Sequence, residues 1–314
     1  MSLSSYQSVK RTSENSFSRP PSVPMAVFAG FTGDRSGSME SMANQAADGL
    51  YEFIKSNASN AINQGQQGFI SATTFDDTAI VRLDNVPVED IEISARECRK
   101  WMKPEGCTRL YDTAIEDLAR LQRREREWRA NLPDNIKALN PKTTIVWSLM
   151  TDGFNNASQF TAEDFRNAVQ KARKNGVICY FLAANQDACA TGERYGFSAD
   201  QSITFDSTPA TCSQAMRAVT TSALRCASGY SNVNFTQTMR QTSAPASFNS
   251  PQDDDSDDDM VPPAPQVYRA HLRQPAQSRL GGRPPRILRM TRGGLNFARQ
   301  MYTLSQNAKN MKRK

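Results

Sequence analysis

The segment Asp34-Arg35-Ser36-Gly37-Ser38-Met39 follows a short apolar stretch, residues 25–31, and precedes a long amphipathic pattern. This order of segments predicts a strand, a tight turn and a helix. Asp34, Ser36 and Ser38 place one carboxylate and two hydroxyl groups at alternate positions of the turn, where all three can point into one small space. Hard oxygen donors arranged in this way suit Mg²⁺ or Mn²⁺ better than a soft metal.

Two later segments supply further donors. Gly106-Cys107-Thr108-Arg109-Leu110-Tyr111-Asp112 is a glycine-hinged loop that carries a hydroxyl into a predicted helix. Ile145-Val146-Trp147-Ser148-Leu149-Met150-Thr151-Asp152-Gly153 is an apolar strand with a carboxylate at its end. Because ligands of open α/β sheets collect at the carboxyl ends of strands, Asp34 and Asp152 are expected at one edge of a sheet, with Thr108 on a loop between them in sequence.

Asp-x-Ser-Gly-Ser, Gly-x-Thr-x-Leu and Thr-Asp-Gly, in this order, resemble the von Willebrand factor A domain and its metal-ion-dependent adhesion site, over residues 24–230. The resemblance implies an α/β fold with a doubly wound, mostly parallel sheet flanked by helices. It also implies five metal-coordinating positions, which are Asp34, Ser36, Ser38, Thr108 and Asp152. The sixth position of a bound Mg²⁺ or Mn²⁺ would be left for an acidic side chain of a protein partner. The alternative is a turn kept for structural reasons that binds no metal.

The rest of residues 24–230 alternates between strand and helix patterns, as a doubly wound sheet requires. The spacing of apolar residues predicts helices at 38–55, 110–128, 165–172 and 207–228, and strands at 69–75, 80–83, 177–183 and 202–205. Gly30 and Gly33 are unusual in a central strand, where glycine often marks a bulge or a close backbone approach. We therefore expect the first strand to be short or kinked just before Asp34.

Asn185 and Asp187 follow the predicted strand at 177–183, so they are expected at the same edge as the metal. They are candidates for orienting a ligand there. For Asp187 we favour a second role, as the residue that caps the amino end of a helix.

The residue inventory limits the classes of function. The 314-residue chain has six cysteines without Cys-x-x-Cys spacing. It has no amino-terminal pattern typical of a signal peptide and no apolar run long enough to span a membrane. Together these features predict an intracellular protein of the cytoplasm or nucleus with free thiols. Its one histidine, His271, lies in a polar tail, so histidine-based nucleophilic catalysis and histidine-ligated zinc have no candidate in the folded domain. There is no P-loop or dinucleotide fingerprint. We predict that the protein is not an enzyme.

The ends of the chain differ in composition from the domain. Residues 1–23 are polar and serine-rich and are predicted to be a disordered arm. Residues 231–259 are predicted to be a polar linker that ends in an acidic run, Asp253-Asp254-Asp255-Ser256-Asp257-Asp258-Asp259. Residues 260–314 contain 12 Lys or Arg and no Asp or Glu, so they are predicted to be a basic, largely disordered tail, with a possible short helix at 294–312.

The tail suggests a second, charge-driven contact. Basic side chains attract phosphates of nucleic acids and other polyanions, and the candidates for such a contact are Arg283, Arg286, Arg289, Arg292, Lys312, Arg313 and Lys314. Ser256, among aspartates, resembles a site for an acid-directed kinase.

The sequence thus leads to three hypotheses. The first is a metal-dependent protein–protein interaction module that acts as an intracellular adaptor or scaffold. The second is a nucleic-acid-associated protein in which the basic tail binds RNA or DNA and the domain is mainly structural. The third, least supported by the residues, is a Mg²⁺-dependent phosphohydrolase.

Overall fold

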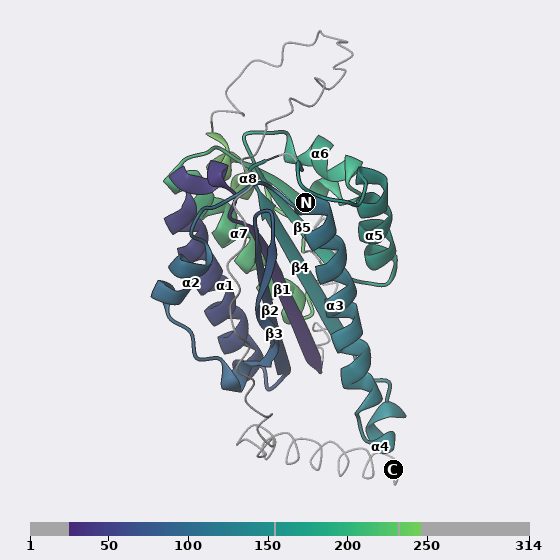
Figure 1. The fold of residues 1–314 in the computed structure, drawn as a ribbon. Helices are drawn as coiled ribbons and strands as arrows, with labels where there is room; N and C mark the ends of the chain where they lie inside the picture. The colour runs from purple at the N-terminus through teal and green to yellow at the C-terminus, as the bar shows by residue number, and fades with distance from the viewer. Residues whose placement is uncertain (1–24, 154, 232, 246–314) are drawn as a thin grey trace, which may run out of the picture.

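The computed structural model describes residues 25–153, 155–231 and 233–245. Within them, six strands form one sheet in the order β3-β2-β1-β4-β5-β6 (Figure 1). The strands are β1 (Ala26–Asp34), β2 (Gln67–Phe75), β3 (Ala79–Pro87), β4 (Thr143–Thr151), β5 (Ile178–Ala184) and β6 (Ser202–Phe205). Every neighbouring pair is parallel except the hairpin of β2 and β3. The prediction of a doubly wound, mostly parallel sheet is therefore confirmed.

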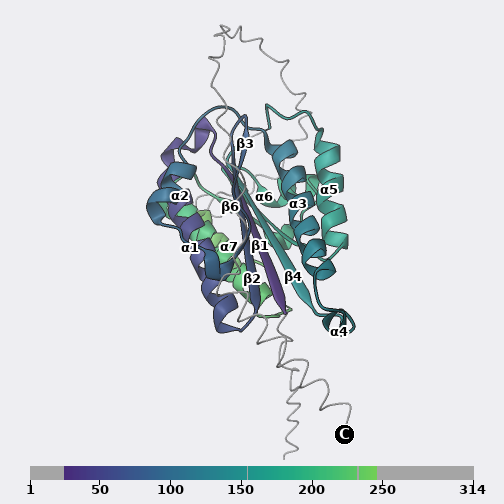
Figure 2. The same cartoon turned by 60° about the horizontal axis from the view of Figure 1, so that its bottom comes forward.

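Helices cover both faces of the sheet (Figure 2). One face carries α1 (Ala43–Asn63), α2 (Ala95–Trp101) and α7 (Pro209–Ala227), and the other carries α3 (Leu110–Ala130) and α5 (Ala162–Lys174). Shorter elements are η1 (Gly37–Ser41), η2 (Val88–Asp90), α4 (Asp134–Lys137), α6 (Ala188–Arg194), η3 (Ala199–Gln201) and α8 (Gln237–Ser243). No helix in the described ranges is long and apolar enough to cross a bilayer.

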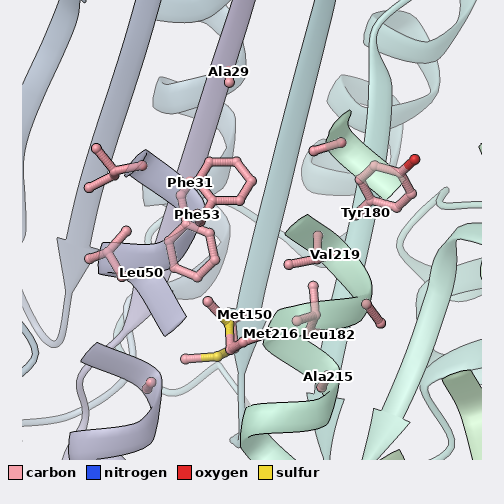
Figure 3. Close-up of a cluster of buried hydrophobic side chains, with 14 of the residues drawn as sticks. Ala29, Phe31, Leu50, Phe53, Met150, Tyr180, Leu182, Ala215, Met216 and Val219 are labelled. Atoms are coloured by element: carbon pink, nitrogen blue, oxygen red, sulfur yellow. The ribbon is translucent and has the colours of Figure 1, made fainter. Parts of the chain in front are cut away.

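Each face of the sheet has its own hydrophobic core. Phe31 and Met150 pack with Phe53 of α1 and with Met216 and Val219 of α7 (Figure 3). On the opposite face, alternate residues of the same strands pack against α3 and α5, and this second core includes Leu118, Trp147, Leu149, Phe165, Phe181 and Phe197. A sheet buried on both faces explains why its central strands read as nearly continuous apolar runs.

β1 is neither short nor kinked, so the expectation drawn from its glycines was wrong. All nine residues pair in register with β2, and Ala26 to Gly33 pair in register with β4. The glycines allow close packing instead: a Cβ on Gly30 would lie 2.4 Å from Cδ1 of Leu121, and one on Gly33 would lie 2.9 Å from the ring of Phe31. Gly30 therefore lets α3 approach the centre of the sheet.

The packed part of the chain extends past residue 230, where composition predicted a linker. Val233, Phe235 and Ala244 are buried, and the hydroxyl of Tyr180 donates a 2.7 Å hydrogen bond to the carbonyl of Val233. Because this segment is polar on average, its composition did not indicate that these three apolar residues are buried. Residues 1–24 and 246–314 lie outside the described part, and with them the predicted arm at 1–23, the acidic run, the basic tail and the possible helix at 294–312.

Candidate metal centre

Asp34 and Thr151 are the last residues of the two adjacent central strands, β1 and β4. The Asp34 carboxylate is buried and held at both oxygens. Its Oδ1 accepts a 2.8 Å hydrogen bond from the backbone N–H of Ser36, and its Oδ2 accepts a 2.6 Å hydrogen bond from the hydroxyl of Thr151. The turn after β1 is thereby tied to the end of β4.

The two serines of the turn connect the ends of both strands. Ser36 Oγ and Ser38 Oγ lie 3.1 Å apart, and Ser38 Oγ donates a 2.8 Å hydrogen bond to Oδ1 of Asp152. Asp152 directly follows β4, so its carboxylate and the two hydroxyl groups form one continuous row of oxygens at the carboxyl end of the sheet.

Thr108 reaches the same space from the loop before α3. The N–H of Gly37 donates a 3.2 Å hydrogen bond to the carbonyl of Gly106, which joins this loop to the serine turn. A Cβ on Gly153 would lie 3.6 Å from Thr108 Oγ1 and 3.8 Å from Ser38 Oγ, so both hydroxyls border the small space above Gly153. The five residues predicted as metal ligands thus come together from three loops at one edge of the sheet.

The electrostatics of this cluster favour a cation. Burial raises the pKa of Asp34 to about 6, against hydrogen bonds from Thr151 and Ser36 that lower it, and burial also raises the pKa of Asp152. Within the described ranges, no basic side chain forms an ion pair with either carboxylate. A positive charge held between them would offset the cost of burying both anions.

The chemistry of the donor set bears on which cation it would fit. It consists of two carboxylates and three hydroxyl groups, and the described residues contain no cluster of three or more His, Cys, Asp or Glu suited to a metal. All-oxygen sets of this kind fit Mg²⁺ or Mn²⁺, which keep part of their water shell, better than zinc, which prefers nitrogen and sulfur. The residues therefore fit the expected ion.

Arg35, inside the first motif, points away from the donors and holds the loops around them. Its guanidinium pairs with the buried carboxylate of Asp76 in the turn between β2 and β3. It also donates 3.3 Å hydrogen bonds to the carbonyl of Lys103 and to Glu105, in the loop that leads to Thr108. Residues 76–77 lie between the two strands predicted at 69–75 and 80–83. No role was predicted for Arg35, because its contacts join three loops that are distant in sequence.

The polar loop after Asp152 fixes Thr108. Asn156 Oδ1 accepts a 2.8 Å hydrogen bond from the N–H of Thr108, and the N–H of Asn156 donates a 3.0 Å hydrogen bond back to the carbonyl of Thr108. Asn155 and Ser158 accept from the N–H groups of Leu110 and Tyr111 in the same way. The role of this loop was not predicted from the sequence, although a run of Asn and Ser after an apolar strand is typical of side chains that bond to backbone.

Asn185 and Asp187 lie at the same edge of the sheet but are engaged in local structure. Asp187 Oδ1 accepts from the N–H groups of Cys189 and Ala190 at 2.8 and 3.0 Å, so its predicted role as the N-cap of α6 is confirmed. Asn185 has a positive φ of 51° and bridges the ends of β5 and β6, with its Oδ1 2.8 Å from the N–H of Ser207. A role for either in orienting a ligand stays a prediction.

The candidate contacts of the tail lie outside the described residues. They are Ser256, Arg283, Arg286, Arg289, Arg292, Lys312, Arg313 and Lys314.

No family model matches this sequence, and no curated protein matches it. Solved structures do. They include a von Willebrand factor type A protein from Catenulispora acidiphila (16% identity, 63% of this chain and 43% of that chain, TM-score 0.42). Proximal thread matrix protein 1 from the mussel byssus, with a zinc-occupied MIDAS motif, is 18% identical over 65% of this chain and 46% of that chain (TM-score 0.38). The SpRpn10 VWA domain is 10% identical over 61% of this chain and 93% of that chain (TM-score 0.41).

This chain spans less than half the length of the bacterial and mussel proteins, and identities of this size concern the fold alone. The sheet has an antiparallel edge strand, β3, and the Asp-x-Ser-Gly-Ser turn lies at the carboxyl end of β1. This topology defines a domain with the von Willebrand factor A fold.

Proposed function

We propose that this domain holds Mg²⁺ or Mn²⁺ and uses it to recognise a protein partner that offers a carboxylate. The ligands would be Asp34, Ser36, Ser38, Thr108 and Asp152. The observation that supports this proposal is the convergence of five oxygen-bearing side chains from three separate loops, with Ser38 Oγ 2.8 Å from Asp152 and both Ser38 and Thr108 facing the space above Gly153.

The kinds of side chain in this ligand set indicate which chemical group a partner would offer to the ion. Two carboxylates would balance the charge of a dication, while the three hydroxyl groups are neutral. The five side chains would leave the sixth position of an octahedral ion to an exchangeable water, and a carboxylate of a partner would take that position as one more hard oxygen ligand. The chain's own residues would orient the ion and leave that position to the partner.

We place this module inside the cell, as an adaptor or scaffold. All six cysteines are free, and four of them are buried: Cys98, Cys179, Cys212 and Cys226. Burial raises the pKa of the Cys98 thiol to about 12, so the thiol stays protonated and unreactive. Free thiols in this number are typical of proteins kept in a reducing compartment.

Calorimetric titration of the full chain with Mg²⁺ and Mn²⁺ tests the metal site. We expect binding that is lost in Asp152→Asn and weakened at least tenfold or so in Ser38→Ala, each of which removes a ligand. Asp134→Asn is the matched control, because Asp134 is fully exposed on α4, at the opposite end of the sheet. Equal metal affinity in all four proteins would overturn the proposal.

Partner recognition is tested by capture from a lysate treated with nuclease, in Mg²⁺ and again in EDTA. Partners retained only in Mg²⁺, and lost with Asp152→Asn, would support the proposal. Partners that ignore EDTA, and that are captured only when the nuclease is omitted and residues 260–314 are present, would favour the nucleic-acid hypothesis instead. The absence of enzymatic activity stays a prediction; turnover of a phosphate ester that is abolished by Asp152→Ala would contradict it.

A further inference from the structure

The proposed metal centre does not use the buried carboxylate of Asp117 in α3. This residue is 4% exposed, and both of its oxygens are bonded to the sheet. Thr32 of β1 donates a 2.5 Å hydrogen bond to Oδ2, and Thr73 of β2 donates a 3.1 Å hydrogen bond to Oδ1. Arg120, one turn further along α3, forms an ion pair with Oδ1. Asp117 therefore ties α3 to two neighbouring strands.

This polar cluster extends to the next strand on either side. Nε1 of Trp147 in β4 donates a 2.9 Å hydrogen bond to Oγ1 of Thr32. Nη2 of Arg120 donates a 2.6 Å hydrogen bond to Oγ1 of Thr73, and Nε of Arg120 lies 3.9 Å from Oδ1 of Asp84 in β3. Four strands are thus connected to one short stretch of α3.

The register of the sheet places the cluster one step along β1 from the metal centre. Thr32 pairs with Thr73, and Asp34 pairs with Phe75 two residues later. Because alternate residues of a strand point to the same face, the side chains of Thr32 and Asp34 lie on one face of the sheet, about 7 Å apart along the strand. The cluster contains none of the five proposed ligands, so its effect on the ion would be indirect.

The helix that carries Asp117 also follows the loop that carries Thr108. Thr108 stands two residues before Leu110, the first residue of α3. The N–H of Arg109 donates a 2.7 Å hydrogen bond to the carbonyl of Asp76, in the turn after β2. Since a helix rises about 1.5 Å per residue and 5.4 Å per turn, even a small slide of α3 along the sheet would move Thr108 by a comparable distance. The position of α3 thus sets the distance between Thr108 and the serine turn.

A carboxylate is an unfavourable anchor for a helix unless the direction of its bonds matters. Burial raises the pKa of Asp117, against Arg120 and the two threonines, which lower it. Replacement of a buried ion pair by apolar side chains is often neutral or stabilising, and α3 already packs on the sheet through Leu118 and Leu121. What hydrogen bonds of fixed direction add to apolar packing is a single register of the helix on the sheet.

We infer that Asp117 is a positioning residue of the metal centre. It fixes α3 along the sheet and thereby holds Thr108 at the distance from Ser36 and Ser38 that the ion requires. This inference rests on the proposed function, in which Thr108 is a ligand. It implies that metal affinity depends on a carboxylate that does not touch the ion.

A double-mutant cycle with Thr108 tests whether Asp117 acts through this ligand. In the full chain, we expect Asp117→Asn to raise the Kd for Mn²⁺ about tenfold. In Thr108→Ala, where the ligand is already lost, the same change should raise the Kd less than about twofold. The electron paramagnetic resonance signal of free Mn²⁺ measures the Kd of all four proteins. Equal losses in the two backgrounds, or no loss in either, would overturn the inference.

Thr73→Val is a milder variant, which removes one hydroxyl from the cluster and keeps a residue suited to a strand. We expect its Kd for Mn²⁺ to rise several-fold, because Asp117 loses one of its donors. Thr73→Ser keeps the hydroxyl and should bind Mn²⁺ like the parent chain. A folded valine variant with parental affinity would contradict the role of the cluster.

Glu125→Gln is the matched control, further along the same helix. Glu125 is also buried, forms an ion pair with Arg129 and accepts a 2.8 Å hydrogen bond from Oγ1 of Thr143, at the start of β4. Figure 1 shows this end of α3 next to α4, at the opposite end of the sheet from α6. The variant should have a lower thermal midpoint and an unchanged Kd for Mn²⁺. A Kd raised as much as in Asp117→Asn would mean that any loosening of α3 weakens the site, and would overturn the specific role of Asp117.

The outcomes separate the inference from the proposed function. If the parent chain binds no Mn²⁺, or if Thr108→Ala binds it like the parent, Thr108 is not a ligand and both fail. If Thr108→Ala weakens binding and Asp117→Asn does not, the metal site stands and Asp117 only stabilises the fold.

Discussion

The hydroxyl of Thr151, at the end of β4, donates a 2.6 Å hydrogen bond to Oδ2 of Asp34, at the end of β1. Asp34 Oδ1 is bonded to the N–H of Ser36, so the carboxylate is fixed at both ends. Thr151 is not one of the five expected ligands. It positions one of them, and it explains how a buried carboxylate keeps a single orientation although no basic side chain in the described part of the chain pairs with it.

Thr151→Val removes this donor and keeps the shape of the side chain. Since a hydrogen bond to a charged group contributes about 1.5–3 kcal/mol, we expect the free energy of unfolding to fall by that amount. The affinity for Mn²⁺ should fall about tenfold because Asp34 loses its orientation. Thr151→Ser, which keeps the hydroxyl, is the control in both measurements; a valine variant that binds Mn²⁺ like the parent would contradict the positioning role.

Gly153→Ala puts a methyl group into the space that Thr108 Oγ1 and Ser38 Oγ border. The new methyl group would lie 3.6 Å from Thr108 Oγ1 and 3.8 Å from Ser38 Oγ, which is ordinary contact, so the fold should tolerate it. It would displace the ion or its water, and we expect calorimetry to show at least about tenfold weaker Mg²⁺ binding, or roughly 1.4 kcal/mol. The thermal midpoint should stay unchanged. Parental affinity in a folded alanine variant would show that the ion lies elsewhere.

Gly30→Ala tests why a glycine interrupts the central strand. Its methyl group would approach Leu121 Cδ1 to 2.4 Å, and overpacking of this kind costs about 1–3 kcal/mol. Leu121→Ala alone should cost about 2–5 kcal/mol because it leaves a cavity.

In the double variant the methyl group enters that cavity. Denaturant unfolding should therefore show a total loss smaller than the sum of the two single losses by at least about 0.5 kcal/mol. Additive losses would mean that Gly30 serves the strand's backbone and not the packing of α3.

Asp112 makes the loop around the site sensitive to acid. Burial alone would raise the pKa of this carboxyl, but the N–H groups of Gln159 and Phe160 and the guanidinium of Arg109 outweigh burial and hold it below its usual range. The unfolded chain therefore binds a proton more readily than the folded one. The contribution of Asp112 to stability is present above about pH 4 and is lost as the pH falls through the lowered pKa.

We expect Asp112→Asn to lower the free energy of unfolding at pH 7 by about 1.5–3 kcal/mol. The difference between parent and variant should stay constant from about pH 7 to pH 5 and shrink below about pH 4. Urea titrations at these pH values measure it. A difference that grows toward low pH would mean that folding raises the pKa of Asp112 and does not lower it.

The architecture was predictable because its determinants are local. Short apolar runs located each strand of the sheet, and the short motifs placed Asp34, Thr108 and Asp152 at strand ends or on an adjoining loop. The part that escaped prediction depends on contacts between distant segments. Nothing near Arg35 in the sequence indicates that it reaches Asp76 and Lys103, and nothing near Gly30 indicates Leu121.

The end of the domain escaped prediction for a different reason. The segment 231–245 is polar on average, and composition weighs all of its residues equally. Its packing depends on a few of them, such as Val233 and Phe235, and on one arginine, Arg240. An average over a window cannot separate a linker from a segment held by a few anchors.

This last segment protects the sheet from self-association. β6 is an edge strand, and on its side away from β5 the carbonyls of Ser202 and Thr204 accept hydrogen bonds from Arg240 and Ser243 of α8, at 2.6 and 2.8 Å. A fragment that stops at residue 230 would leave these groups unpaired, ready to pair with a strand of another molecule. Light scattering should therefore show aggregation of residues 24–230 under conditions in which residues 24–245 stay monodisperse, and equal behaviour of the two would show that α8 is dispensable.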